Sequence, residues 1–178
     1  MEVDISVVAD TFVIVDSTSV TGYNGTGLAY GGGYYWSYDQ GSTSGNIYKY
    51  DYLIDSPLDS FYIGYWYNTD LAYIDSCIYY GRSSTYPTDI YRYNLRTSMS
   101  EVVCDECCDG GGAQGLATDG TYLYVTTGST TLGQNIIRID VLSYPTLVID
   151  TVIDLLPSHT FSIDGMAYTG DGPCRAIS

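Results

Sequence analysis

Short apolar and aromatic runs alternate with polar segments along the chain. Typical runs lie at 77–80 and 122–125, and stretches rich in Gly, Ser, Thr and Asn separate them. Runs of this length between turn-forming residues are typical of β-strands, whereas an amphipathic helix repeats its apolar positions every three or four residues. No window of the sequence sustains the helical period. The pattern therefore predicts an all-β protein with almost no helix.

Two sequence markers recur in phase and divide the chain into repeats. The first is Gly-Leu-Ala-Tyr at 27–30, which returns with small changes at 70–73, 115–118 and 165–168. The second lies at 46–51, 89–94 and 135–140 and carries a basic residue in the same place each time. Because both markers keep the same order over three units, each unit is expected to fold as the same supersecondary structure.

Each unit is expected to form four short strands. The first marker is strand one, an aromatic or β-branched run is strand two, and the second marker is strand three. The fourth strand is more variable and lies at 59–63, 100–103 and 147–153. Four strands in a repeat of about 45 residues are typical of a β-propeller blade.

The third unit carries a family resemblance. Its residues 115–127 are Gly-Leu-Ala-Thr-Asp-Gly-Thr-Tyr-Leu-Tyr-Val-Thr-Thr. This segment resembles the YVTN-type repeat of surface-layer and other extracellular propellers, as does its continuation at 139–140 and 151–153. The first two units are looser matches, with aromatic residues in place of Val. The resemblance implies a propeller fold over nearly the whole chain, but it implies little about activity because propellers host many functions.

The two ends of the chain are expected to share a fourth blade. Strand-like runs predict a half blade at 1–26, blades at 27–69, 70–114 and 115–164, and a half blade at 165–178. The predicted fold is a single β-propeller domain of four blades of four antiparallel strands. Closure within one chain is favoured because it removes open sheet edges. In the alternative, the end strands pair with the next copy and build a ring or filament.

Composition excludes several classes of function. Six Lys and Arg against 21 Asp and Glu give a formal net charge of −15, which disfavours nucleic acid and anionic membrane surfaces as partners. No apolar stretch approaches the roughly 18 residues of a transmembrane helix, so no membrane insertion is expected. His159 is the only histidine and the sequence has no Gly-x-Ser-x-Gly elbow. No catalytic residue is therefore predicted, and the chain is expected not to be an enzyme.

Lys49, Arg92 and Arg138 are half of the basic residues and occupy one repeat position. One interpretation is a ring of cations that binds an anion at the central channel. In the favoured interpretation, each cation pairs with a carboxylate of a neighbouring blade or lies over a Tyr ring. Strand three usually lies away from the propeller axis, and carboxylates are abundant. We therefore expect inter-blade ion pairs at these three positions.

Aromatic and acidic residues suggest two kinds of ligand. Tyr62, Tyr65 and Trp66 lie on an outer strand and the loop after it, so they are candidates for contact with a sugar or a protein partner. Most of the 21 tyrosines are instead expected to fill the layers between blades. Four Asp-Gly pairs, together with Asp55 and Asp59, suggest Ca²⁺. No run has the order of a calcium loop, so turn formation is favoured and no other cofactor is expected.

Cysteines and composition favour an extracellular or cell-surface location. The cysteines are Cys77, Cys104, Cys107, Cys108 and Cys174. Their odd number leaves one thiol free or paired between molecules. Disulfides within 104–108, or from there to Cys77, are favoured over a metal site because no second ligand pair is nearby. Asn24 begins an Asn-Gly-Thr glycosylation sequon.

These features favour a non-enzymatic extracellular structural module that associates with copies of itself through its end strands, as a ring or a filament. The first alternative is a lectin-like propeller that binds carbohydrate through Tyr and Trp clusters, with a glycan or a surface protein as its partner. The second alternative is a fragment of a larger propeller enzyme.

Overall fold

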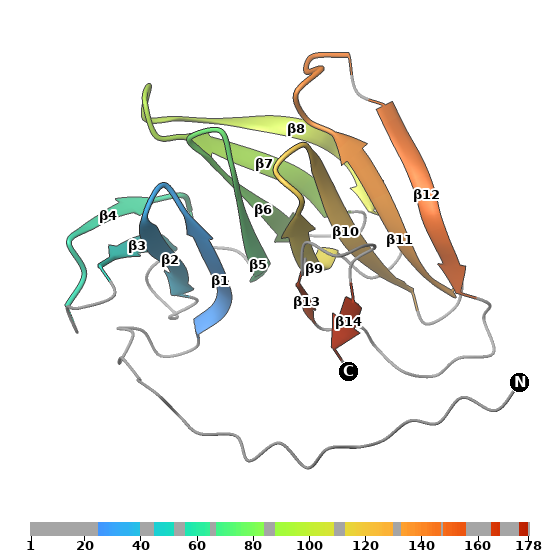
Figure 1. Ribbon diagram of the computed structural model, residues 1–178, viewed down its shortest axis with the longest axis horizontal. Coiled ribbons are helices and arrows are strands. Elements are labelled where there is room, and N and C mark those ends of the chain that lie inside the picture. The colour runs from blue at the N-terminus through green and yellow to red at the C-terminus, as the bar shows by residue number, and fades with distance from the viewer. Residues whose placement is uncertain are drawn as a thin grey trace, which may run out of the picture.

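The computed structural model describes residues 25–39, 45–51, 56–64, 67–83, 88–108, 113–129, 133–146, 148–155, 165–167 and 175–177. All regular elements in these segments are β-strands. Twelve strands form three antiparallel sheets of four, and the last two form a short hairpin (Figure 1). The prediction of an all-β chain is therefore confirmed.

Each four-stranded sheet is called a blade below. Blade one contains β1 (Gly25–Gly31), β2 (Tyr34–Asp39), β3 (Asn46–Tyr50) and β4 (Asp59–Tyr62). Blade two contains β5 (Tyr67–Ile74), β6 (Cys77–Ser83), β7 (Thr88–Asn94) and β8 (Met99–Cys108). Blade three contains β9 (Ala113–Thr118), β10 (Tyr122–Ser129), β11 (Gly133–Asp140) and β12 (Val148–Leu155). The hairpin consists of β13 (Gly165–Ala167) and β14 (Arg175–Ile177).

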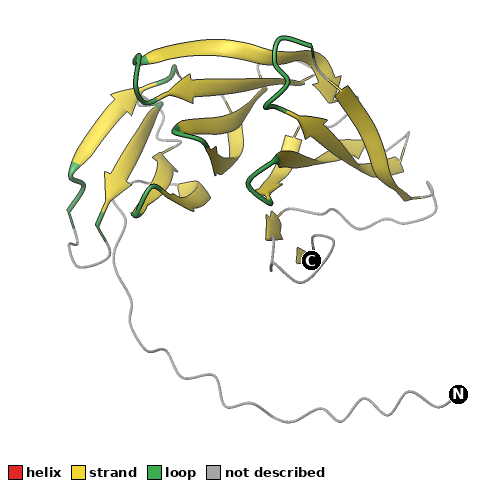
Figure 2. Ribbon diagram, turned by 45° about the horizontal axis from the view of Figure 1, so that its top comes forward, coloured by secondary structure: helices red, strands yellow, loops and turns green. Residues whose placement is uncertain are grey.

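The three blades stand side by side in an arc (Figure 2). Their first strands lie on the inner side, where β1 contacts β5, β5 contacts β9, and β9 contacts β13. The last strands, β4, β8 and β12, lie at the opposite edges of their sheets. Sheets arranged in this way around their first strands make the fold propeller-like.

Tight turns join the first two strands of each blade. The β1–β2 turn contains Gly32 and Gly33, with φ of 63° and 82°, and the β5–β6 turn contains Asp75 and Ser76, with φ of 43° and 64°. Two central residues with positive φ fit a type I′ turn, whose twist matches that of a hairpin. The β9–β10 turn uses Asp119 instead, because its Oδ1 accepts two backbone N–H groups at 2.8 and 2.7 Å.

The same cross-strand triplet occurs in all three blades. A basic residue on the third strand lies opposite an aromatic residue on the second strand and an acidic residue on the fourth. Residues directly opposite each other place their side chains on the same face of a sheet. The triplets are Trp36–Lys49–Asp59, Tyr79–Arg92–Glu101 and Tyr124–Arg138–Asp150.

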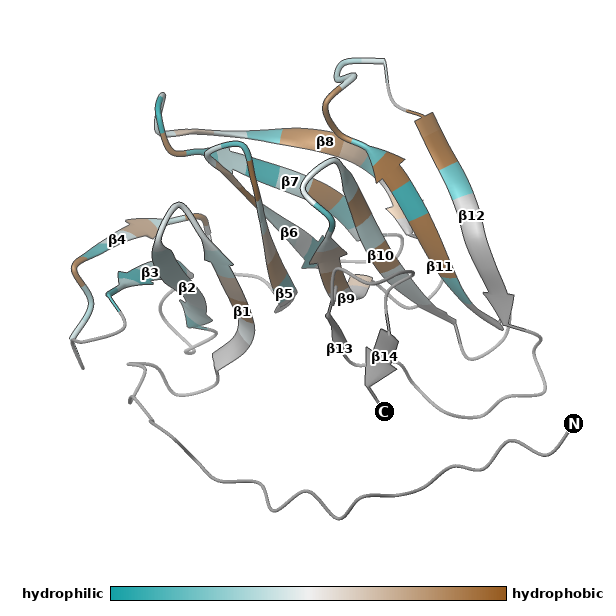
Figure 3. Cartoon of the chain, in the orientation of Figure 1, coloured by the Kyte–Doolittle hydropathy of each residue, from teal (hydrophilic) through white to brown (hydrophobic). Residues whose placement is uncertain are grey.

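Two apolar layers join the blades. Residues such as Trp36, Ile47 and Leu71 pack between blades one and two, and others such as Ile90 and Val125 pack between blades two and three. Apolar and polar segments follow each other along β11 in Figure 3. Ile137 and Ile139 are buried on either side of Arg138, as expected for an alternating strand, whereas the adjacent Ile136 is also buried because the register shifts between Ile136 and Ile137. The largest fully buried side chains among the described residues are tyrosines: Tyr38, Tyr50, Tyr79 and Tyr80. Tyr38, Tyr79 and Tyr80 belong to the filling between the blades, whereas Tyr30 and Tyr62 are exposed, so tyrosine forms only part of this filling.

Candidate functional site: an aromatic groove between two blades

A groove of about 490 Å³ opens between blades one and two. Strands β2, β3 and β4 line one side, and β5, β7 and the β5–β6 and β7–β8 turns line the other. The lining residues include five aromatic residues, three serines, two basic residues and one aspartate. It is called the interblade groove below. A space of this size and mixed chemistry is suited to a small-molecule ligand.

Five aromatic side chains from both sides of the interblade groove contact one another and together are called its aromatic wall. Tyr34, Trp36 and Phe61 come from blade one, and Tyr73 and Tyr93 come from blade two. Trp36 stacks on Tyr73 with ring centres 6.3 Å apart, and Phe61 stacks on Tyr93 with ring centres 3.9 Å apart. Tyr34 meets Trp36 edge-on at 6.4 Å. Because each stacked pair joins the two blades, the wall is held in place by the packing of the blades themselves.

Lys49 differs from its two repeat equivalents. Arg92 Nε and Arg138 Nη2 each lie 2.7 Å from a carboxylate oxygen of the acidic residue opposite. Lys49 Nζ lies 3.6 Å from the centre of the Tyr34 ring and 5.6 Å from the centre of Trp36. Within the described part of the chain, its ammonium forms no ion pair. The positive charge of blade one therefore faces the groove without a carboxylate partner of this kind.

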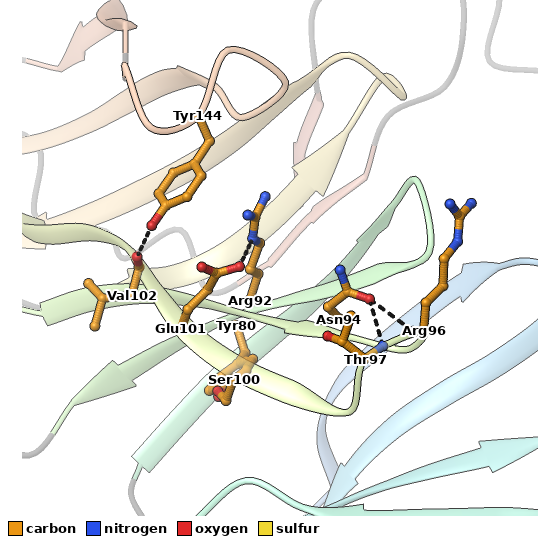
Figure 4. Close-up of polar contacts among 9 residues, drawn as sticks. All are labelled: Tyr80, Arg92, Asn94, Arg96, Thr97, Ser100, Glu101, Val102 and Tyr144. Atoms are coloured by element: carbon orange, nitrogen blue, oxygen red, sulfur yellow. Dashed lines mark hydrogen bonds and ion pairs between the residues drawn. The ribbon is translucent and has the colours of Figure 1, made fainter.

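Arg96 brings a second positive charge to the groove from the tip of the β7–β8 turn. Asn94 Oδ1 accepts the backbone N–H groups of Arg96 and Thr97 at 2.9 and 3.2 Å and thereby fixes the turn (Figure 4). The Arg96 side chain is 72% exposed; its Nη2 lies 3.6 Å from an Asp75 carboxylate oxygen and donates to Ser76 Oγ at 3.2 Å. Exposed ion pairs of this kind contribute about 0–1 kcal/mol, so little energy is lost when Arg96 turns toward a ligand.

The carboxylate partners of Arg92 and Arg138 lie within their own blades and not on a neighbouring blade as expected, whereas the other expected contact, a cation over a Tyr ring, is present at all three basic positions. The carboxylates that pair with Arg92 and Arg138 belong to the same blade as the arginine, because the register places strands three and four opposite each other. Lys49 forms no ion pair with a described residue. Arg92 does contact the next blade, but through a ring: its guanidinium lies 4.3 Å from the centre of Tyr144, which follows β11 (Figure 4).

Asp70 stands where the other markers have glycine, on the inner strand β5. Its Oδ2 accepts the N–H of Leu116 at 2.9 Å, and its Oδ1 accepts the N–H of Leu71 at 2.8 Å. Burial raises the pKa of Asp70 from 3.8 to about 6, against the opposing effect of hydrogen bonds from the backbone of Leu116, Leu71 and Leu28. Gly27 lies so close that a Cβ there would be 2.8 Å from Asp70 Cα. The carboxyl therefore connects β1, β5 and β9 at the centre of the arc.

Solved structures with this fold include a designed protein and an enzyme. The crystal structure of the computationally designed Ika4 protein matches with a TM-score of 0.51 and 15% identity, over 90% of this chain and 94% of that one. XC5397 from Xanthomonas campestris, a gluconolactonase, matches with a TM-score of 0.56 and 15% identity, over 82% of this chain and 52% of that one. This chain thus covers about half of the enzyme's length. At such identity the likeness shows the fold alone.

No protein-family model and no curated protein matches the chain. The resemblance to YVTN-type repeats therefore extends no further than the propeller-like fold.

The gluconolactonase contradicts one expectation drawn from the sequence. The chain was expected not to be an enzyme, because it has a single histidine and no nucleophile elbow. An enzyme nevertheless shares the fold. The missing motifs exclude only some kinds of catalysis, since chemistry depends on a local site rather than on the fold. The likeness assigns no reaction to this chain.

The residues predicted to contact sugars lie outside the interblade groove or outside the described part of the chain. Tyr62 is 60% exposed on β4, but its neighbour Phe61, rather than Tyr62 itself, lines the groove. Successive residues of a strand point to opposite faces, which explains the difference. Tyr65, Trp66 and the sequon residue Asn24 lie outside the described residues.

The cysteines form one disulfide in the described part of the chain. It joins Cys104 to Cys107, within the segment where sequence placed it. Cys77 is a buried free thiol, and burial raises its pKa. The side chain of Cys108, and Cys174 as a whole, lie outside the described residues.

No candidate metal centre is found among the described residues, where no three His, Cys, Asp or Glu side chains are arranged to hold an ion. Asp59 Oδ1 accepts the N–H of Ser60 at 2.8 Å, and Asp119 forms a turn, while Asp55 lies outside the described residues. The described segments also contain no helix long and apolar enough to cross a bilayer.

The interblade groove is not visible in the repeat pattern because residues of two repeats build it. Phe61, Tyr73 and Tyr93 look like ordinary strand residues until the blades are placed together. One sequence pattern does point to a residue of the groove. In every unit an acidic residue on strand four follows the basic residue of strand three, and this order makes Asp59 the counterpart of Glu101.

Proposed function

We propose that the chain is a carbohydrate-binding propeller and that the interblade groove is its binding site. The observation that carries the proposal is the five-ring wall placed beside hydroxyl and charged groups in one open groove. A sugar ring has an apolar C–H face, which packs well on an aromatic side chain, and a rim of hydroxyls that need donors and acceptors. The groove supplies both kinds of contact.

The polar groups of the groove are placed around the aromatic wall. Ser76 and Ser98 supply hydroxyls that donate and accept, and Asp59 supplies an acceptor. The wall is held by stacking between blades, so little side-chain freedom is lost when a ligand binds. By its name, the gluconolactonase acts on a sugar lactone, which is compatible with a sugar site on this fold. The predicted extracellular or cell-surface location would expose such a site to glycans.

Two neighbouring residues of β4 test the proposal. The wild-type chain is titrated with the oligosaccharides that bind best on a glycan array, and the affinity is measured by calorimetry. Phe61→Leu removes a ring from the groove while keeping apolar bulk, and it is expected to weaken binding about 10-fold or more. Tyr62→Leu removes an exposed ring outside the groove and is the matched control, expected to change affinity less than 2-fold. A glycan array without binders, or equal losses from both variants, contradicts the proposal.

Ring closure, alone or with a further copy, is a second candidate function supported by the inner strands. Strand β13 lies beside β9 in the same way that β9 lies beside β5 and β5 beside β1. On β1, Leu28 and Tyr30 are 61% and 65% exposed. We propose that residues 1–24, which precede β1, and residues 165–178 complete a fourth blade, within one chain or with a second copy, and cover this side of blade one. Such closure would suit an extracellular assembly module.

Molar mass in solution tests this second candidate. A closed ring within one chain predicts a particle of 19.5 kDa by light scattering, independent of concentration. Strand exchange between copies predicts a multiple of that mass. Deletion of residues 1–24 is expected to expose β1 and to cause association of a monomeric chain. A deletion variant that stays monomeric and equally stable would count against a fourth blade built by these residues.

A further inference from the structure

We infer that the interblade groove selects acidic saccharides, which carry carboxylate or sulfate groups. The inference rests on the proposed sugar-binding function of the groove and names its ligand class. Lys49 and Arg96 are two of the six basic residues of the entire chain, and both line this groove. Its lining therefore has more positive than negative side chains in a protein whose net charge is −15.

The three blades provide an internal comparison for Lys49. Each blade places a basic residue opposite an acidic one, and in blades two and three the pair closes to 2.7 Å. In blade one, the Lys49 ammonium lies over the Tyr34 ring at 3.6 Å and not at ion-pair distance from Asp59. A cation over an aromatic face keeps its full charge. It is thus placed to meet an anionic group on a sugar that packs against the wall.

Arg96 supplies the second contact from the opposite blade. Its guanidinium has a fork of donors that matches carboxylate and sulfate oxygens. Its present partner, the carboxylate of Asp75, lies 3.6 Å away, and both side chains are more than 70% exposed. Such a pair is weak in water. Exchange of this partner for a ligand anion at the groove therefore costs little.

Acidic groups near the groove oppose the attraction of anionic sugars by Lys49 and Arg96. Asp59 lines it, Asp75 faces Arg96, and Asp51 follows Lys49 by two positions and is engaged in an interaction of its own. The field of the whole chain repels anions at long range. A preference for acidic sugars must therefore come from the local cations Lys49 and Arg96, so observing this preference would identify these cations as its source.

The experiment compares matched pairs of tetrasaccharides by calorimetry at low ionic strength. One pair is an oligogalacturonate and its carboxyl-reduced form, in which each carboxylate has become a CH2OH group. The other pair is a sulfated galactan tetrasaccharide and its desulfated form. The wild-type chain is expected to bind at least one acidic member about 10-fold more tightly than its neutral partner, and this preference is expected to shrink as salt is added. The two pairs distinguish carboxylate from sulfate.

Variants then locate the preference. Lys49→Gln and Arg96→Gln are each expected to weaken binding of the acidic member about 5-fold or more and to weaken binding of the neutral member clearly less, so that the preference for the acidic member shrinks in each variant. Arg138→Gln removes the equivalent cation of blade three, which is outside the groove, and should change neither affinity. Arg96 lies on an exposed turn, so its variant is expected to fold even if Lys49→Gln does not.

The outcomes distinguish failure of the preference for acidic sugars from failure of the proposed carbohydrate-binding function. Equal binding of acidic and neutral members overturns the inference and leaves the carbohydrate proposal intact. Binding of neither pair, together with an empty glycan array, contradicts the proposed function itself. An equal loss in Lys49→Gln and Arg138→Gln shows a general charge effect and also overturns the inference.

Discussion

Replacement of Asp70 by Asn is expected to remove a specific pH dependence from the stability of the fold. Asp70 accepts backbone N–H groups of Leu116 and Leu71, and burial raises its pKa from 3.8 to about 6. The folded chain therefore holds this proton more tightly than the unfolded chain. The stabilisation is complete below about pH 3.8 and is lost as the pH rises through about 6.

The size of the effect follows from the two pKa values. A difference of one pH unit corresponds to about 1.4 kcal/mol, so the interval from 3.8 to about 6 corresponds to at most about 3 kcal/mol. The Asn side chain keeps one acceptor oxygen but cannot ionise. The Asn variant also places an amide N–H2 against a backbone donor, which lowers stability by about 1–3 kcal/mol at any pH. Only the pH-dependent part of the difference in unfolding free energy between the two proteins reports on the carboxyl proton.

Urea unfolding at pH 4, 5, 6 and 7 measures the effect for both proteins. The free energy of unfolding of the wild-type chain, minus that of Asp70→Asn, should fall by about 2–3 kcal/mol from pH 4 to pH 7. Asp59→Asn removes an exposed aspartate and controls for the change in net charge. A difference that stays constant within about 0.5 kcal/mol over this range would refute the assignment of a raised pKa to Asp70.

Three further substitutions or treatments test the packing. Gly27→Ala would place a methyl group 2.8 Å from the backbone of β5, so it is expected to lower the free energy of unfolding by about 2 kcal/mol or more in the same urea assay. Gly33→Ala has open space around the added methyl group but a φ of 82°, so it should lower the free energy of unfolding by about 1 kcal/mol. Cys77 is buried with a raised pKa, so mass spectrometry should find it unmodified by iodoacetamide in the folded chain and modified in urea; rapid labelling of the folded chain would be inconsistent with its burial. Tyr144→Leu removes the ring over Arg92 and should lower stability by about 0.5–1 kcal/mol; no change would show that this contact between blades two and three contributes nothing measurable.

The strand pattern was predictable because it depends on local residues. The Leu-Ala-Tyr markers, the turn at 119–120 and the basic strand-three positions all lie within one repeat, and the alternation of polar and apolar residues places them on strands. Local pattern is thus sufficient for the all-β fold and its blades.

The site was less predictable because it depends on register and on packing between repeats. Arg92 was assigned a partner on another blade, but Glu101 lies directly opposite on β8, and this pairing is set across a turn of variable length. Asp70 is a single substitution at a position where the other markers have glycine. Its role as an acceptor for the backbone N–H groups of neighbouring inner strands is visible only once β1, β5 and β9 are placed side by side. The stacking of Phe61 on Tyr93 joins two repeats, so no single repeat contains it.

The two tryptophans allow the binding site to be tested directly. Trp36 lines the interblade groove, where its Nε1 donates to the Gly31 carbonyl at 3.0 Å, and the other tryptophan is Trp66. Protein with ¹⁵N-labelled tryptophan gives two indole signals in a two-dimensional NMR spectrum, and Trp66→Phe assigns them. Titration with an acidic tetrasaccharide should shift the Trp36 indole signal in a saturable way. Saturable binding that shifts Trp66 alone, or leaves the Trp36 signal fixed, would contradict the interblade groove as the binding site.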